Sequence, residues 1–221
     1  NKAVSIIAPP GVYAGVSVFS GTGIVVNPAS GKVTLRGLTI NALGGSTGID
    51  YQSGDALYLD NVSVSGFPTA GLNALLSMAG TVAIHGSTFR GNGVGASFGT
   101  AGTFGAELQA TVADTQFDGN TTGVRFTGGS ASGEFRQSTI AGGTTGAQLA
   151  PSLAGAIDRV DFLDSTITRH SGSGVVAGGA GGTANVSLTG SMVSGNGTGV
   201  GALAAGTVYL TDTTVTRNAT G

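Results

Sequence analysis

The sequence predicts an all-β fold, a single-stranded parallel β-helix with three short strands in every turn. Three observations predict it: a motif that recurs at nearly constant spacing, apolar residues that alternate with polar ones inside each copy, and Gly, Asn or Asp where the alternation stops. A fixed repeat of roughly 25 residues is typical of a solenoid, in which each turn buries its apolar face against its neighbours. No segment shows the 3.6-residue spacing of an amphipathic helix.

About eight copies of the repeat follow one another, and we expect residues 1–221 to form one domain. Residues 32–221 carry the copies, while residues 1–31, with the turn at Pro9-Pro10-Gly11, are expected to form less regular N-terminal turns. The copies read LRGLTINALGGSTGI from Leu35, LDNVSVSGFPTAGL from Leu59, IHGSTFRGNGVGA from Ile84, VADTQFDGNTTGV from Val112, FRQSTIAGGTTGA from Phe135, FLDSTITRHSGSGV from Phe162, LTGSMVSGNGTGV from Leu188 and LTDTTVTRNATG from Leu210.

Neither end of the sequence shows a polar cap. An uncapped terminal rung exposes unpaired backbone and apolar core. The sequence is therefore expected to be a fragment of a longer protein, or to stack end to end on a partner through its terminal rungs.

Each copy contains three strands. The first alternates apolar residues, as in Val33 and Leu35, and the third begins with glycine followed by an apolar residue, as in Gly123-Val124. Period-two spacing of β-branched residues between turn formers is typical of strands. The second strand carries one apolar anchor per copy, and the anchors are expected to stack about 4.8 Å apart: Ile40, Val64, Phe89, Phe117, Ile140, Ile167, Val193 and Val215.

Two rows of turn residues separate these strands. The row between the first and second strands favours a left-handed backbone, which Gly, Asn and Asp tolerate best: Gly37, Asn61, Gly86, Asp114, Gln137, Asp164, Gly190 and Asp212. The row between the second and third strands is rich in asparagine, which can form a hydrogen-bonded ladder along the axis: Leu43, Phe67, Asn92, Asn120, Gly143, His170, Asn196 and Asn218. His170 is accordingly interpreted as filling a turn rather than as a catalytic base.

This order of strands and turns, with its "GV" third strand, resembles the right-handed parallel β-helix superfamily of pectate lyases and related polysaccharide-active proteins. The resemblance covers about residues 32–221. It implies a right-handed solenoid from a bacterial protein that is secreted or displayed at the cell surface, although no signal peptide is visible in this segment. It also implies polysaccharide as a partner. One fold hosts many activities, so function has to be argued from the side chains.

Composition excludes several classes of function. Only 9% of residues are charged and the net charge is −2, so no basic stripe is present for binding nucleic acid. No apolar stretch reaches the length of a membrane span. With two histidines and no cysteine, the spacing offers neither disulfides nor a transition-metal cluster, and no cofactor is expected.

A candidate catalytic pair lies on the outer face of the first strand, where stacking places Glu134 beside Asp161 with Arg136 one step away. Two neighbouring carboxylates raise one pKa and suit a retaining glycosidase. The alternative is a pair of solvated charges balanced by Arg136 and Arg159, on a flat sheet without a cleft. The pair belongs to what we term the middle row, Thr34, Tyr58, Ala83, Thr111, Glu134, Asp161, Ser187 and Tyr209.

Arg36, Asp60 and His85 line up in the neighbouring outer row, with Tyr58 alongside. These four side chains are the candidate substrate-binding residues, and a surface ion-pair ladder is the alternative interpretation. We term this row the flanking row: Arg36, Asp60, His85, Ala113, Arg136, Leu163, Thr189 and Thr211.

The resemblance argues against a lyase, because its active site lies mainly on the strand that begins "GV" here. The outward residues of that strand include one aspartate and one arginine three turns apart, whereas calcium needs several converging oxygen ligands. Calcium would be required only if the chain were a lyase. Enzyme activity is left open, with a non-enzyme favoured. The outward row reads Asp50, Asn73, Ser97, Arg125, Gln148, Val176 and Gly201.

The sequence therefore favours a β-helix scaffold with a carbohydrate-binding, structural or adhesive role. A polysaccharide lyase or glycoside hydrolase is the first alternative. An ice-binding surface is the second, suggested by the outward pairs Thr39/Asn41, Ser63/Ser65, Thr166/Thr168 and Thr214/Thr216 of the second strand. Arg90, Asp118 and Met192 interrupt that array.

Overall fold

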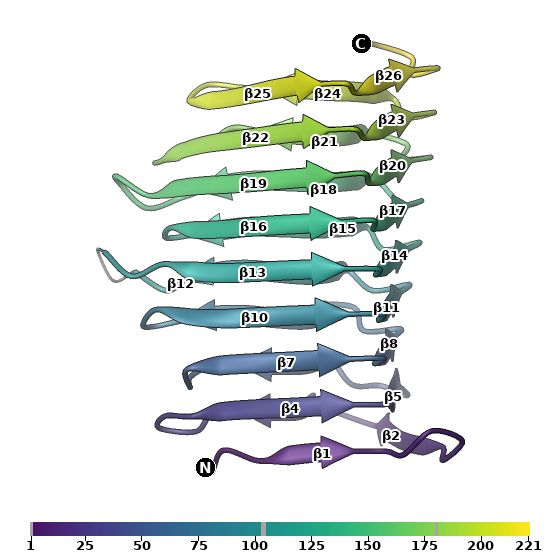
Figure 1. Ribbon diagram of the computed structural model, residues 1–221, viewed down its shortest axis with the longest axis vertical. Helices are drawn as coiled ribbons and strands as arrows, with labels where there is room; N and C mark the ends of the chain where they lie inside the picture. The colour runs from purple at the N-terminus through teal and green to yellow at the C-terminus, as the bar shows by residue number, and fades with distance from the viewer. Residues whose placement is uncertain (1, 103–104, 180) are drawn as a thin grey trace.

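The computed structural model describes residues 2–102, 105–179 and 181–221, which wind into one solenoid of three parallel sheets (Figure 1). Each of the first eight turns contributes one strand to each sheet, the described part of the ninth contributes strands to the first two sheets, and no helix occurs among the described residues. The all-β prediction with three strands per turn is therefore confirmed.

The first sheet has nine strands, all parallel to their neighbours, and the order along the axis follows the order in the chain. Its strands are β1 (Ser5–Ile7), β4 (Lys32–Arg36), β7 (Ala56–Asp60), β10 (Gly80–His85), β13 (Leu108–Ala113), β16 (Ala131–Arg136), β19 (Ile157–Leu163), β22 (Thr183–Thr189) and β25 (Gly206–Thr211).

The second sheet also has nine strands, most of them only three residues long. They are β2 (Ala14–Val18), β5 (Leu38–Ala42), β8 (Ser63–Ser65), β11 (Thr88–Arg90), β14 (Gln116–Asp118), β17 (Thr139–Ala141), β20 (Thr166–Thr168), β23 (Met192–Ser194) and β26 (Thr214–Thr216).

The third sheet has eight strands and closes each turn. They are β3 (Thr22–Val26), β6 (Thr47–Tyr51), β9 (Ala70–Leu76), β12 (Val94–Thr100), β15 (Thr122–Gly128), β18 (Thr145–Pro151), β21 (Ser173–Ala177) and β24 (Thr198–Ala202). Residues 5–26 thus supply one strand to each of the three sheets, and the Pro9-Pro10-Gly11 turn lies between β1 and β2.

The predicted register is confirmed in the second sheet. The anchors pair in sequence, for example Val64 with Phe89 and Phe89 with Phe117. Seven of the eight anchors are buried, and Val215 in the last turn is half-buried. The aromatic anchors stack: the rings of Phe89 and Phe117 lie 5.2 Å apart at 9°. Identical side chains on neighbouring turns therefore pack directly on one another along the axis of the solenoid.

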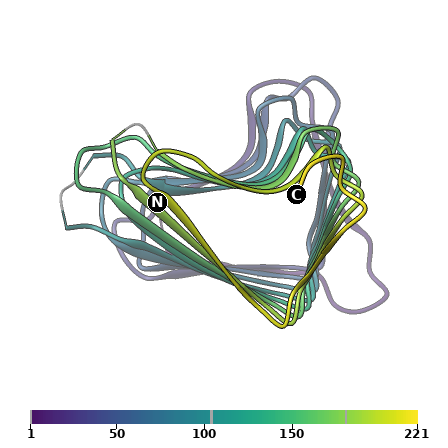
Figure 2. The same cartoon turned by 90° about the horizontal axis from the view of Figure 1, so that it is seen from above.

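The corner between the first and second sheets is built as the turn row predicted. Asn61, Asp114, Gln137, Asp164 and Asp212 have φ between 48° and 52°. The three glycines of the row also have positive φ. Seen along the axis, the turns from β4 onward lie close together at this corner and diverge in the loops between the third and first sheets, while the N-terminal loop between β1 and β2 bulges away from the corner (Figure 2). The left-handed residue therefore fixes the corner on every turn from β4 onward.

A ladder of hydroxyls stabilises the same corner, which the sequence analysis did not anticipate. Each hydroxyl donates to the carbonyl two residues before it, as Ser138 Oγ does to Arg136 O at 2.8 Å. The oxygen of Ser165 in turn accepts the backbone N–H of Ser138 from the preceding turn at 3.2 Å. The donors to the carbonyls are Ser87, Thr115, Ser138, Ser165, Ser191 and Thr213.

The asparagine ladder forms as predicted at the second corner. The backbone N–H and Nδ2 of Asn92 both donate to Oδ1 of Asn120, at 2.9 and 3.0 Å. Asn196 and Asn218 repeat this arrangement. His170 occupies the same row, is buried, and places Nε2 3.2 Å from the Ile140 carbonyl. Burial lowers the pKa of His170, so a neutral imidazole with a proton on Nε2 fills this position.

The glycine at the second position of each strand of the third sheet is required by close packing. A Cβ on Gly71 would lie 2.8 Å from the carbonyl oxygen of Gly95 and 3.0 Å from both Phe89 and Asn92. No side chain fits into that space. The stripe of glycines consists of Gly23, Gly48, Gly71, Gly95, Gly123, Gly146, Gly174 and Gly199.

Apolar side chains are exposed at both ends of the solenoid. Ile6 and Ile7 of β1 are about half exposed, and so is Leu210 of β25. β1 and β25 are the edge strands of the first sheet. End-to-end stacking through the terminal rungs stays a prediction.

Candidate functional site

The outer face of the first sheet carries the residues that the sequence singled out, in the register expected. Glu134 on β16 pairs directly with Asp161 on β19, with Thr111 and Ser187 on the strands beyond them. Paired positions on adjacent strands lie about 4.8 Å apart. The two carboxylates are therefore neighbours on one surface.

Glu134 is held by the arginine two residues further along the same strand. Arg136 donates from Nε to Oε1 at 2.6 Å and from Nη2 to Oε2 at 2.9 Å. These hydrogen bonds lower the pKa of the Glu134 carboxyl. A general acid in glycoside hydrolysis needs a raised pKa instead, so Glu134 is a hydrogen-bond acceptor at neutral pH rather than a proton donor.

Asp161 is exposed, and among the described residues it makes no ion pair or side-chain hydrogen bond. Arg159, two residues earlier on the same face of β19, is also exposed and outside the ion pairs of the described chain. Both groups are therefore free to contact a ligand. The balance of charges that the sequence suggested is formed by Arg136 with Glu134, while Arg159 and Asp161 stay apart.

The flanking row forms a ladder of ion pairs across successive turns. Arg36 Nε lies 2.9 Å from Asp60, whose other oxygen lies 3.4 Å from Nδ1 of His85. His85 Nε2 lies 3.4 Å from Asp114. From the sequence, Asp114 was expected only in the turn row, so its contact with His85 was not predicted. Since Arg36, His85 and Asp114 are more than half exposed and Asp60 is about one third exposed, the ladder contributes little stability.

A shallow groove runs along the outer face of the first sheet, across the strands. It consists of three open depressions of about 370, 320 and 340 Å³. The first two share Gln109, and the last two share Arg159 and Asp161. We call it the axial groove. Its polar lining consists of Asp55, Thr81, Glu107, Gln109, Thr111, Ser132, Glu134, Arg159, Asp161, Asn185, Ser187 and Tyr209.

Glu134 and Asp161 both line the central depression. The depression is shallow and open to solvent, so it does not contradict the expectation that the pair lies on a flat sheet without a cleft. Small residues, Thr111 and Ser132 among them, separate the larger side chains there. Tyr58 lies outside the lining, half-buried in the middle row, and it pairs with Ala83 on β10.

The outer face of the third sheet shows a self-contained polar cluster. Asp50 accepts hydrogen bonds from Asn73 Nδ2 at 2.8 Å and from Gln52 Nε2 at 2.6 Å. Arg125 lies two strands away from Asn73. Across residues 2–102, 105–179 and 181–221, no group of three His, Cys, Asp or Glu side chains is arranged to hold a metal ion.

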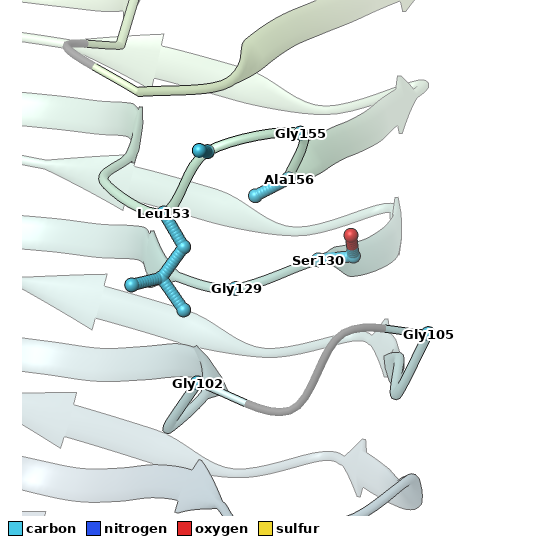
Figure 3. A pocket seen from close by; sticks show the side chains of 8 residues that line it. Gly102, Gly105, Gly129, Ser130, Leu153, Gly155 and Ala156 are labelled. Atoms are coloured by element: carbon cyan, nitrogen blue, oxygen red, sulfur yellow. The ribbon is translucent and has the colours of Figure 1, made fainter.

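A separate cavity of about 260 Å³ lies between the loops that join the third sheet to the first (Figure 3). Glycine and alanine line most of it, and the Leu153 side chain projects into the space. Among the described residues of its lining, Ser130 has the one polar side chain, and its Oγ accepts a hydrogen bond from the backbone N–H of Ile157 at 3.1 Å. The described lining of the cavity therefore provides few polar groups that could recognise a ligand.

Asp158 is a buried carboxylic acid that the sequence analysis missed. It occupies an inward position of β19, in line with Val160 and Phe162, and that alternation is the signal that could have revealed it. Oδ1 accepts the N–H of Ala131 at 3.1 Å, while Oδ2 has no hydrogen-bond partner. Burial raises the pKa of Asp158 to about 7.

Comparisons with known proteins agree with this geometry. The family model described as "Right handed beta helix region" matches residues 22–190. Neither the curated proteins nor the solved structures contain a match to the chain. The described part of the chain has no helix long and apolar enough to cross a membrane.

Proposed function

The chain belongs to the right-handed β-helix family, and from that premise we propose that it is a secreted or surface-displayed scaffold that binds polysaccharide along the axial groove. The observation that carries this proposal is the continuity of the groove. Its three depressions share lining residues and cross six neighbouring strands, from β10 to β25. At the usual strand spacing this length is about 24 Å, which suits an extended chain molecule.

The lining of the groove supplies the groups that recognise sugars. Amides at Gln109 and Asn185 both donate and accept hydrogen bonds, and the carboxylate of Asp161 accepts them from hydroxyl groups. Tyr209 is exposed at the last turn, where its ring can pack against the apolar face of a sugar. A few placed polar groups around an apolar contact are typical of ligand sites.

The scaffold fixes the backbone that carries these groups. Strands β13, β16, β19 and β22 pair over six or seven positions each. The hydroxyl ladder lies where the strands of the second sheet begin, and the asparagine ladder lies where they end. The backbone therefore does not have to be ordered when a ligand binds, and only side-chain entropy is lost.

Catalysis by Glu134, Asp161 and Arg136 stays an untested alternative. Glu134 and Asp161 are neighbours, as a retaining pair requires, but the Arg136 hydrogen bonds favour the ionised form of Glu134. A catalytic version predicts that Glu134→Gln abolishes chain cleavage while the polymer is still retained. A binding scaffold cleaves nothing in either form.

The proposal is tested with immobilised and soluble polysaccharides of neutral and acidic types, scored together for retention and for chain shortening. We expect retention without shortening, and at least a tenfold loss of affinity in the double variant Gln109→Ala/Asn185→Ala. The matched control is Gln116→Ala/Thr166→Ala, which removes exposed or half-exposed side chains from the second sheet. Absence of any retained polymer, or equal losses in both double variants, would overturn the proposal.

A further inference from the structure

The axial groove carries more negative than positive charge, and we infer that its ligand is a polysaccharide without acidic groups. The inference rests on the proposed function and adds the chemical class of the ligand. Four carboxylates line the groove, at Asp55, Glu107, Glu134 and Asp161, against one guanidinium at Arg159.

Among the described residues, one of these carboxylates forms an ion pair: Arg136, outside the lining, donates hydrogen bonds to both oxygens of Glu134. Asp55 accepts the backbone N–H of Gly31 at 2.9 Å. Asp55, Glu107 and Asp161 form no ion pair in the described part of the chain. Within that part, the groove therefore presents three carboxylates and the Arg159 guanidinium without ion-pair partners.

The charges are also unevenly distributed. The depression shared by β10 and β13 is lined by Asp55 and Glu107, and none of the described residues that line it is basic. Arg159 lies with Asp161 in the two depressions further along the axis. A uronate polymer, with one carboxylate on each sugar, would place negative charges along all three depressions. Repulsion between like charges is strongest where no cation intervenes.

An uncharged sugar meets the same groups favourably. Its hydroxyls donate to Glu107 and Asp161 in charge-assisted hydrogen bonds, which are stronger than neutral ones. Arg159 can donate to ring and hydroxyl oxygens of the sugar beside them. The carboxylates thus select the ligand in two ways. They accept hydrogen bonds from sugar hydroxyls, and they repel the carboxylates of acidic polymers.

The test uses soluble polymers in matched pairs that differ in charge on one backbone: dextran and carboxymethyl dextran, hydroxyethyl cellulose and carboxymethyl cellulose, methyl-esterified and free polygalacturonate. Affinity electrophoresis of the full chain measures binding to each. We expect the uncharged member of every retained pair to bind at least about fivefold more tightly at low salt. This difference in affinity between the uncharged and the acidic polymer should disappear near 0.5 M salt, where the screening length falls to a few ångströms.

A charge-removing variant separates this effect from polymer stiffness. Glu107→Gln/Asp161→Asn should bind the acidic polymers more tightly and narrow the gap. Asp118→Asn, on the second sheet, is the matched control and should leave the gap unchanged. If the acidic members bind as tightly as the uncharged ones at low salt, the inference is wrong while the proposed function stands. If no polymer of either kind is retained, the proposed function itself fails, and this inference with it.

Discussion

At the scale of single residues, the least favourable group in the interior is the Asp158 carboxyl. It is fully buried between Ala131 and Ala184 on the adjacent strands, and it has one hydrogen bond for two oxygens. Burial disfavours its ionised form, because no cation compensates the charge, and its pKa is raised from 3.8 to about 7. The folded protein therefore keeps a proton that the unfolded chain releases.

This residue makes stability depend on pH. A pKa raised on folding gives stability that is complete below about pH 4 and is lost as the pH rises through about 7. At roughly 1.4 kcal/mol per pH unit, the loss is at most about 4 kcal/mol. Asp158→Asn keeps the acceptor for Ala131 and removes the charge. We expect the variant to match the wild type near pH 4 and to be more stable by a few kcal/mol at pH 8.

Urea unfolding followed by circular dichroism between pH 4 and pH 8 measures the difference between the two proteins. Taking the difference removes contributions from other groups, such as His170. Asp118→Asn, an exchange of the same type at a half-exposed position, is the control and should show no such trend. If the difference in free energy of unfolding between wild type and variant stays constant from pH 4 to pH 8, Asp158 does not titrate as described.

At the scale of strands and turns, the same backbone path is repeated because a different set of residues stabilises each corner. Left-handed residues and hydroxyls form the first corner, and asparagines with the glycine stripe form the second. At the second corner the strand approaches the next turn so closely that no Cβ fits. The glycine stripe is therefore a packing requirement and not a source of flexibility.

Gly71→Ala tests this requirement. The added methyl would lie 2.8 Å from the Gly95 carbonyl oxygen, against backbone that cannot move without shifting the next turn. We expect a loss of about 2–4 kcal/mol in the free energy of unfolding. The control is Gly201→Ala on β24, where the nearest atom to a new Cβ is 3.9 Å away, and a change within about 0.5 kcal/mol is expected. Equal urea midpoints for the two variants would refute the packing argument.

The sequence was sufficient for the elements because the repeat aligns equivalent residues eight times over. Even Gln137, an unusual residue for a left-handed turn, was assigned correctly from its place in the row. The hydroxyl ladder was missed, although a Ser or Thr after the turn residue in six copies was visible. Hydroxyls at a turn have several structural explanations, so their presence in the sequence does not by itself predict a ladder.

The site was predictable only in part. Register follows from the repeat, so the neighbours of Glu134 and Asp161 were assigned correctly. The Arg136 hydrogen bonds depend on side-chain rotamers, and the groove depends on the relative volumes of side chains on several strands. Neither property repeats from turn to turn, so neither could be read from the alternation.

At the scale of the whole molecule, the rod presents three long faces, and the described residues on the outer face of the first sheet combine adjoining depressions with polar groups that form no ion pair. The second sheet has narrow strands and an exposed Arg90–Asp118 ion pair at 3.4 Å. The third sheet has a self-satisfied cluster around Asp50. On the outer face of the first sheet, Asp161 and Arg159 form no ion pair in the described part of the chain and can contact a ligand.

The location of the bound polymer is the measurement that tests this account most directly. Carbodiimide labelling of carboxylates, read by mass spectrometry, would compare the chain alone with the chain saturated by a retained polysaccharide. We expect Asp161 and Glu107 in the axial groove to be protected, while Asp118 on the second sheet and Asp212 at the first corner are labelled as before. Protection of Asp118 without Asp161, or no change at Asp161 under saturating polymer, would contradict the assignment of the groove as the binding site.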